Sequence, residues 1–101
     1  MITGGGVSGV VIARPNLLTP SQGTMTTTFD GTGIAGATNL AMKIYTVAGE
    51  LVKSFQGSSG IAMATWNADG MASGIYLAVA EARDASGGLL SRQTTKILVL
   101  H

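Results

Sequence analysis

The chain has 101 residues and a formal net charge of +1, with 46% hydrophobic residues, only 11% charged residues and no cysteine. This length suits one domain with one modest core. The absence of cysteine excludes disulfides and thiolate metal sites, and the near-neutral charge without a Lys/Arg cluster excludes the electrostatic footprint of a nucleic-acid-binding protein. The charged fraction lies well below the about 25% typical of soluble domains, which suggests that a neighbouring molecule covers part of the surface.

Residues 1–9 are rich in glycine and hold Gly4, Gly5 and Gly6 in succession. We expect a flexible linker there, followed by one β-domain over residues 10–101. The start has no positively charged segment followed by a long apolar core, so we expect neither a signal peptide nor a membrane-spanning helix. If the protein works outside the cell, the chain is then a mature form or, as we favour, an excised segment.

The first β-prone stretch, at residues 10–12, is a run of β-branched side chains. We expect this strand to end at Pro15, because proline cannot donate to a strand ladder. Residues 15–20 are bounded by prolines and predict an irregular crossing segment whose two leucines cover one end of the core. Residues 24–29 (TMTTTF) are rich in strand-forming side chains and predict the next strand.

Residues 40–55 (LAMKIYTVAGELVKSF) predict the central element of the fold. Leu40, Met42 and Ile44 recur with period two, which predicts that they share the inward face of a strand. Gly49 can supply the positive φ that a tight reversal requires, so we expect a β-hairpin over this stretch. An isolated hairpin is marginally stable in water, and other strands must therefore cover its apolar face.

Three further strands are expected at residues 61–66, 75–82 and 89–100, separated by turns rich in Asn, Asp and Gly. No segment shows a helical period of useful length. Strands of this number and regular spacing predict an all-β fold, an antiparallel β-sandwich of about seven strands.

Four fragments also match motifs that occur together, in this order, in one known family. Residues 14–20 (RPNLLTP) resemble a PNP-F-x-P motif, and residues 43–52 (KIYTVAGELV) resemble an IYdlaGrlV hairpin. Residues 66–76, which begin with Trp-Asn and end with MASGIY, are similar to a WD…lasGvYf segment, and residues 95–99 (TKILV) resemble a tkKivv closing strand. In these motifs the chain resembles the immunoglobulin-like C-terminal modules of secreted bacterial proteins, a group that includes the type IX secretion sorting domain and the immunoglobulin-like module of the flagellar hook-capping protein.

The resemblance covers residues 14–101 and implies an immunoglobulin- or fibronectin-III-like sandwich. It also implies a non-catalytic terminal module of a secreted or cell-surface bacterial protein, which serves sorting, attachment or display of what precedes it. The partners are then proteins: an upstream domain, the secretion machinery or identical subunits. Leu17 stands where the family usually has its second proline, and the turn at residues 67–70 is shorter than in the hook-capping form, which favours the sorting-domain branch.

Few residues are candidates for chemistry. His101 is the only histidine, so a catalytic triad or a multi-histidine metal site cannot be assembled within one chain. Asp30, Asp69 and Asp84 lie in predicted glycine-rich turns and could hold Ca²⁺ if two turns met, although turn aspartates usually bond to their own backbone. We therefore expect no enzyme activity, no metal site and no cofactor.

Two pairs of side chains are candidates for surface roles. Trp66 and Tyr76 could form a sugar-binding platform, which makes a carbohydrate-binding module one alternative function. A single Trp in a small sandwich more often packs in the core. Glu81 and Arg83, two residues apart on one strand, predict a surface ion pair of small energetic value.

The apolar ends of the domain predict strand edges that can contact protein. Val10, Val11 and Ile12 form one such edge, and Lys96 with the apolar residues 97–100 forms the other. An upstream domain could cover these edges, or an edge strand could pair with the next copy to build an extracellular filament or appendage. The remaining alternative is two ordinary sandwich edges without a binding role.

Overall fold

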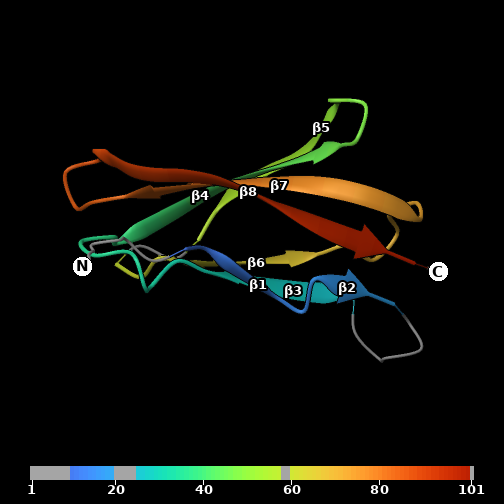
Figure 1. Ribbon diagram of the computed structural model, residues 1–101, viewed down its shortest axis with the longest axis horizontal. Coiled ribbons are helices and arrows are strands. Elements are labelled where there is room, and N and C mark those ends of the chain that lie inside the picture. Colours follow the sequence, from blue (N-terminus) through green and yellow to red (C-terminus); the bar gives the residue numbers. More distant parts are fainter. Residues whose placement is uncertain (1–9, 20–24, 58–59, 101) are drawn as a thin grey trace, which may run out of the picture.

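The polypeptide is built from β-strands: in the computed structural model, which describes residues 10–19, 25–57 and 60–100, every regular element is a strand. The strands are β1 (Ile12–Arg14), β2 (Leu17–Leu18), β3 (Thr26–Asp30), β4 (Asn39–Thr46), β5 (Leu51–Gln56), β6 (Met63–Asn67), β7 (Gly74–Arg83) and β8 (Leu89–Val99). They form a three-stranded sheet in the order β1-β3-β6 and a five-stranded sheet in the order β2-β8-β7-β4-β5. Figure 1 shows the two sheets lying one over the other. The predicted all-β sandwich is therefore confirmed at this level.

The first part of the chain contributes to both sheets. β1 pairs antiparallel with β3, and Pro15 then ends that ladder because proline has no N–H. The chain crosses to the other sheet, where β2 pairs in parallel with β8 and Leu17 lies opposite Leu98. Two predictions are corrected here: residues 15–20 are not wholly irregular, and the sandwich is not wholly antiparallel. Because the crossing divides this segment, the described residues hold eight strands where about seven were predicted.

β4 and β5 form the predicted hairpin. Leu40, Met42 and Ile44 are fully buried, as their period of two indicated. Gly49 adopts a φ of +93° in the turn between the strands. β5 is the last strand of its sheet, and along it only Phe55 is half-buried while the other side chains are exposed. The tip of this hairpin projects from the body of the domain at the upper right of Figure 1.

The core lies between the two sheets. Its largest fully buried side chains are Phe29, Leu18, Leu40, Met42, Ile44, Ile97, Val99 and Thr27. β7 contributes mainly small inward side chains, Ala78, Ala80 and Ala82. Since sheets in a sandwich pack about 10 Å apart, these alanines leave room for bulky groups from other strands, such as Trp66 and Phe29, which belong to the same core cluster.

The other predicted strands agree with the structure to within two residues at either end. Thr24, the predicted linker at residues 1–9 and His101 lie outside the described residues.

Candidate interaction surface

The five-stranded sheet has one face toward the core and one face, here called the outer face, that points away from the three-stranded sheet. The outer face carries Lys43, Tyr45, Ser54, Ile75, Leu77, Val79, Glu81, Arg92, Thr94, Lys96 and Leu98. The pairing of β7 with its neighbours places Leu77 between Tyr45 on β4 and Lys96 on β8. Ile75 is exposed, and Leu77 and Val79 are half-buried. Large apolar side chains therefore run along the middle of a solvent-facing sheet.

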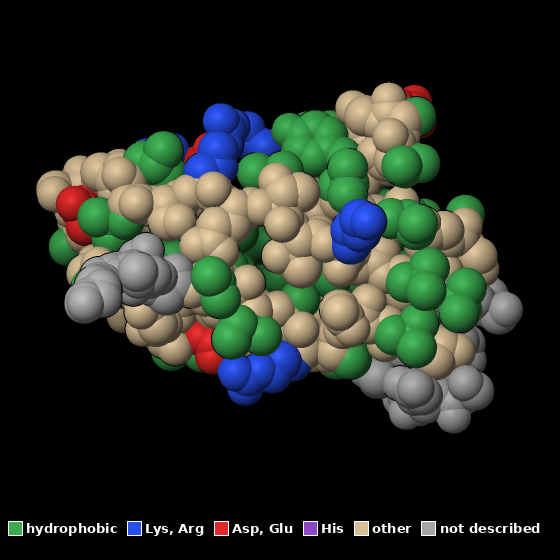
Figure 2. Space-filling view, viewed as in Figure 1, with side chains coloured by type: hydrophobic (Ala, Val, Ile, Leu, Met, Phe, Trp, Pro, Cys, Tyr) green, Lys and Arg blue, Asp and Glu red, His purple; other side chains and the backbone are tan. Residues whose placement is uncertain are grey.

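One end of the outer face is hollowed where β2 joins β8. The hollow has a volume of about 290 Å³ and is lined by Asn16, Leu17, Ile75, Lys96, Ile97 and Leu98. Ile75 and Leu98, opposite each other in the ladder, are 44% and 37% exposed. Hydrophobic side chains gather at this end of the molecule, at the right of Figure 2. An apolar group of a partner protein can be seated here beside the ammonium of Lys96.

Glu81 links two strands of the outer face. Its carboxylate contacts Arg83 at 3.0 Å and Arg92 at 3.3 Å. The first contact is the predicted ion pair, and the second arises because the β7–β8 register places Arg92 opposite Glu81. The hydrogen bond from Arg83 is the main cause that lowers the pKa of Glu81, and the positive charges of Arg83, Arg92 and Lys43 lower it further.

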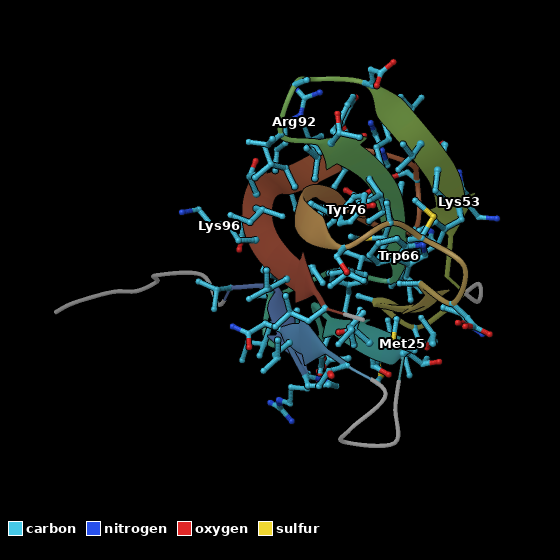
Figure 3. All side chains as sticks on the ribbon, turned by 90° about the vertical axis from the view of Figure 1, so that its right-hand side faces the viewer. Met25, Lys53, Trp66, Tyr76, Arg92 and Lys96 are labelled. Atoms are coloured by element: carbon cyan, nitrogen blue, oxygen red, sulfur yellow. The ribbon has the colours of Figure 1, made fainter. Side chains whose placement is uncertain are left out.

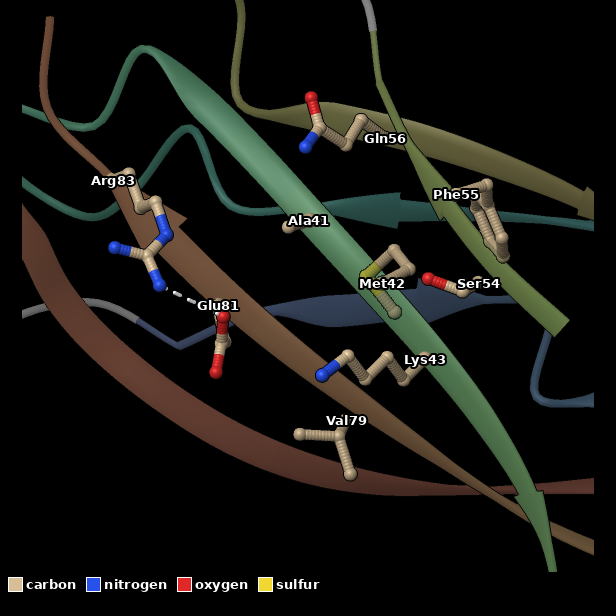
Figure 4. Close-up of a pocket in the computed structure, with 9 residues that line it drawn as sticks. All are labelled: Ala41, Met42, Lys43, Ser54, Phe55, Gln56, Val79, Glu81 and Arg83. Atoms are coloured by element: carbon tan, nitrogen blue, oxygen red, sulfur yellow. Dashed lines mark hydrogen bonds and ion pairs between the residues drawn. The ribbon is translucent and has the colours of Figure 1, made fainter. Parts of the chain in front are cut away.

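A second hollow, of about 210 Å³, adjoins this cluster between β4, β5 and β7. Figure 4 shows Lys43 and Arg83 on either side of Glu81 in this hollow. Lys43, Arg83 and Arg92 lie around Glu81, and Lys96 adds a fourth cation elsewhere on the outer face, although the whole chain carries a net charge of only +1. The outer face is therefore more basic than the rest of the protein.

The structure places Trp66 and Tyr76 in the core. They are 3% and 5% exposed, and Figure 3 labels both in the interior of the molecule. Their rings meet edge-on. The hydroxyl of Tyr76 donates a hydrogen bond to the carbonyl oxygen of Ala72 at 2.7 Å. A sugar-binding platform requires an exposed ring face, and these two residues do not present one.

The other candidate contact residues lie at separate places. Val10 lies just before β1, the edge strand of the three-stranded sheet, and is 58% exposed. Ile12 is the first residue of β1 and is 42% exposed. Val11 is buried, and its N–H donates to Oε1 of Gln93 at 2.8 Å, which ties the start of the domain to β8. Lys96 is exposed and lies on the outer face, beside the apolar hollow.

The three turn aspartates lie in separate turns. Asp30 accepts hydrogen bonds from the backbone and hydroxyl of Thr32, and these bonds lower its pKa. The pKa of Asp84 is also lowered, first by the N–H of Gly88, which donates to its carboxylate. Within residues 10–19, 25–57 and 60–100, no group of three or more His, Cys, Asp or Glu side chains could hold a metal ion.

Sequence reasoning did not identify the apolar strip on β7 as a candidate surface. Period two puts Ile75, Leu77 and Val79 on one face of this strand, but the opposite face is also apolar, so period two alone does not say which face is buried. Glu81 continues the same alternation. Because Glu81 is charged and lies on the same face as the three apolar residues, it is the sequence signal that this face points to solvent.

Comparisons with known proteins add no assignment. No family model matches the chain, and no curated protein matches it. Among the described residues there is also no helix of the length and apolar character needed to cross a membrane.

Proposed function

We propose that this chain is a non-catalytic, immunoglobulin-like β-sandwich module of a secreted or cell-surface bacterial protein, which serves sorting, attachment or display through contact with other proteins. The observation that carries this proposal is the orientation of β7. Ile75, Leu77 and Val79 on this strand point away from the core, while Tyr76 and the alanines of β7 face it. Exposed apolar strips of this kind mark protein interaction sites.

The strand order supports the immunoglobulin-like part of the proposal. The sheets β1-β3-β6 and β8-β7-β4-β5 correspond in order to strands A-B-E and G-F-C-C′ of immunoglobulin-like sandwiches. Tyr76 lies near the start of β7, which takes the place of strand F, and its hydroxyl bonds to a backbone carbonyl four residues upstream. This is the geometry of the tyrosine corner found in such domains.

The non-catalytic part rests on the kinds of side chain present. The sequence has no cysteine and one terminal histidine. Glu81 on the outer face has three guanidinium or ammonium neighbours, Arg83, Arg92 and Lys43, which lower the pKa of its carboxyl group and make it a weaker base.

The experiment fuses the chain to the C-terminus of a reporter in a bacterium with a type IX secretion system. We expect the reporter to reach the cell surface, whereas the reporter without the module stays inside. Leu77→Lys, a change on the outer face, should reduce the cell-bound fraction, and Thr65→Lys, on the exposed side of β6, should not. Retention of the wild-type fusion inside the cell overturns the sorting role, and equal effects of the two lysines overturn attachment through the outer face.

A second candidate function is that of a structural subunit which assembles with copies of itself. The favouring observation is that the five-stranded sheet has two open margins: β5 pairs only with β4, and β2 covers only the last two residues of β8 among the described strands.

A further inference from the structure

The two margins of the five-stranded sheet lie at opposite sides of the domain. Figure 3 shows Lys96 of β8 on one side and Lys53 of β5 on the other. On the β8 side, the described part of β2 pairs with Leu98 and Val99, and no described strand pairs with the earlier residues of β8 on the side away from β7. On the other side, no described strand pairs with β5 on the side away from β4. Among the described strands, each margin therefore presents backbone N–H and C=O groups that can pair with another strand.

The directions of the strands make these two margins fit each other. β8 is antiparallel to β7, β7 to β4, and β4 to β5. β5 consequently runs antiparallel to β8. If a second copy is placed beside the first by translation across the sheet, β5 of one copy meets β8 of the next in the antiparallel orientation, the more stable kind of ladder.

The backbone groups that point outward occur at matching positions. The N–H of Leu98 donates to Asn16 of β2, so by period two Arg92, Thr94 and Lys96 point their N–H groups to the same margin. On β5, the N–H of Gly57 donates to Leu40 of β4, so Ser54 and Gln56 point theirs away from β4. All of these side chains lie on the outer face.

The charges favour this pairing over the symmetric pairing of β8 with β8. The outer-face side chains that β5 brings to the contact, Ser54 and Gln56, are uncharged, whereas β8 brings Arg92 and Lys96. Pairing of β8 with β8 of another copy gathers four cations along one short ladder, and like charges across a ladder are destabilising. Pairing of β5 with β8 places uncharged side chains opposite these cations and so avoids the repulsion between like charges.

We propose that copies of this chain associate head to tail, with β5 of one copy adding as an antiparallel strand to the open part of β8 of the next. The inference rests on the proposed role in protein contact and names a second copy as the partner. Because the contact uses two different margins, it does not close on itself as a dimer does. It continues as a filament of linked sheets or as a ring.

Ser54 provides the test, because it is exposed and lies opposite or diagonal to Arg92 or Lys96 in every antiparallel register that joins these outward groups. Sedimentation velocity over a range of concentrations, with electron microscopy of the heaviest fraction, measures assembly of the purified chain. Ser54→Glu should lower the concentration at which assembly begins by about five-fold, and Ser54→Lys should raise it by about five-fold, as expected for a cross-strand charge pair of either sign.

Thr65→Glu and Thr65→Lys are the matched controls, since Thr65 is exposed on a strand of the other sheet and should leave assembly unchanged. A wild-type chain and a Ser54→Glu variant that both remain monomeric at millimolar concentration overturn the inference. So does weaker assembly of Ser54→Glu, which indicates pairing of β5 with β5. Neither result affects the reporter experiment, so failure of this inference can be told from failure of the proposed function.

Discussion

The ring of Trp66 on β6 meets the ring of Tyr76 on β7 edge-on, with the ring centroids 5.7 Å apart. β6 belongs to the three-stranded sheet and β7 to the five-stranded sheet, so this aromatic pair joins the two sheets through the core. Tyr76 is held further by its hydroxyl, which donates to the carbonyl of Ala72. Tyr76 is therefore held both by its ring contact across the core and by the hydrogen bond of its hydroxyl.

Tyr76→Phe keeps the ring and removes the hydroxyl. We expect the free energy of unfolding to fall by about 1–2 kcal/mol, because the carbonyl of Ala72 loses a partially buried partner. Urea denaturation followed by Trp66 fluorescence measures the change. Tyr45→Phe is the control: Tyr45 is half-buried on the outer face, and its loss of a hydroxyl should change stability by less than about 0.5 kcal/mol. Equal losses in the two variants would contradict the role given to the Ala72 contact.

Thr27→Val should stabilise the protein. Thr27 is fully buried, and its hydroxyl has no hydrogen-bond partner among the described residues. Valine has nearly the same shape without the unsatisfied polar group, so we expect a gain of about 1 kcal/mol in the free energy of unfolding. Thermal and urea unfolding check this value, with Thr65→Val on the exposed side of β6 as the neutral comparison. A destabilised Thr27→Val variant would mean that the hydroxyl is satisfied in solution.

Gly57→Ala should destabilise the protein. Gly57 donates its N–H to Leu40, and a Cβ built on it overlaps the carbonyl oxygen of Met63. The obstacle is backbone rather than a flexible side chain, so β5 or β6 must shift, at a cost of about 3 kcal/mol. Gly60→Ala is the comparison: a Cβ there meets no atom of the described residues within 4 Å, and the positive φ of Gly60 opposes the change, at about 1 kcal/mol. Similar losses for the two glycines would show that space at Gly57 is not limiting.

Ile44→Asp should unfold the domain. Ile44 is fully buried, and an unpaired carboxylate in the core costs several kcal/mol against a total stability of about 5–15 kcal/mol. Circular dichroism and the loss of a cooperative melt report the outcome. Lys53→Asp, at the exposed residue paired with Ile44 in the hairpin, should remain folded. A soluble Ile44→Asp variant that melts cooperatively would show that the inward face of β4 is misassigned.

Stability should fall in acid, partly through Glu81. Its pKa is lowered in the folded state, mainly by the hydrogen bond from Arg83, so the unfolded chain takes up the proton first as the pH falls. The contribution of Glu81 is therefore complete above its ordinary pKa of 4.5 and is lost as the pH falls below that value. At pH 7, Glu81→Gln should cost up to about 1 kcal/mol, the range of partly exposed ion pairs.

Melts of the wild type and of Glu81→Gln between pH 3 and pH 7 test this prediction. The difference between the two proteins should be largest near neutrality and should shrink in acid. A difference that stays constant with pH would show that the ion pairs of Glu81 do not contribute.

Much of the secondary structure could be predicted because its causes are local. Leu40, Met42 and Ile44 alternate with polar or small residues and are followed by Gly49, so both the buried face and the turn of the hairpin were readable from the sequence. The short strand β2 was not. Leu17 and Leu18 form a strand only because they pair with the edge of β8, some eighty residues later in the chain.

The candidate surface was only partly predictable. Lys96 was identified near an exposed margin, but Trp66 and Tyr76, which the sequence offered as a possible exposed platform, lie in the core. The outer face depends on which side of β7 is covered, and on Arg92 reaching Glu81 across the sheet. Neither fact follows from the spacing of residues along one strand.

The sequence by itself determined that this protein is made of strands, where most of them begin and end, and which face of the central hairpin is buried, because alternation and turn chemistry act within a few residues. Only the tertiary structure decided how the strands divide between two sheets, that one pair is parallel, and that Ile75, Leu77 and Val79 of β7 face outward. The reason is steric: the space between the sheets is already filled by side chains from other strands, including Trp66 and Phe29, and the alanines of β7 are what fits against them.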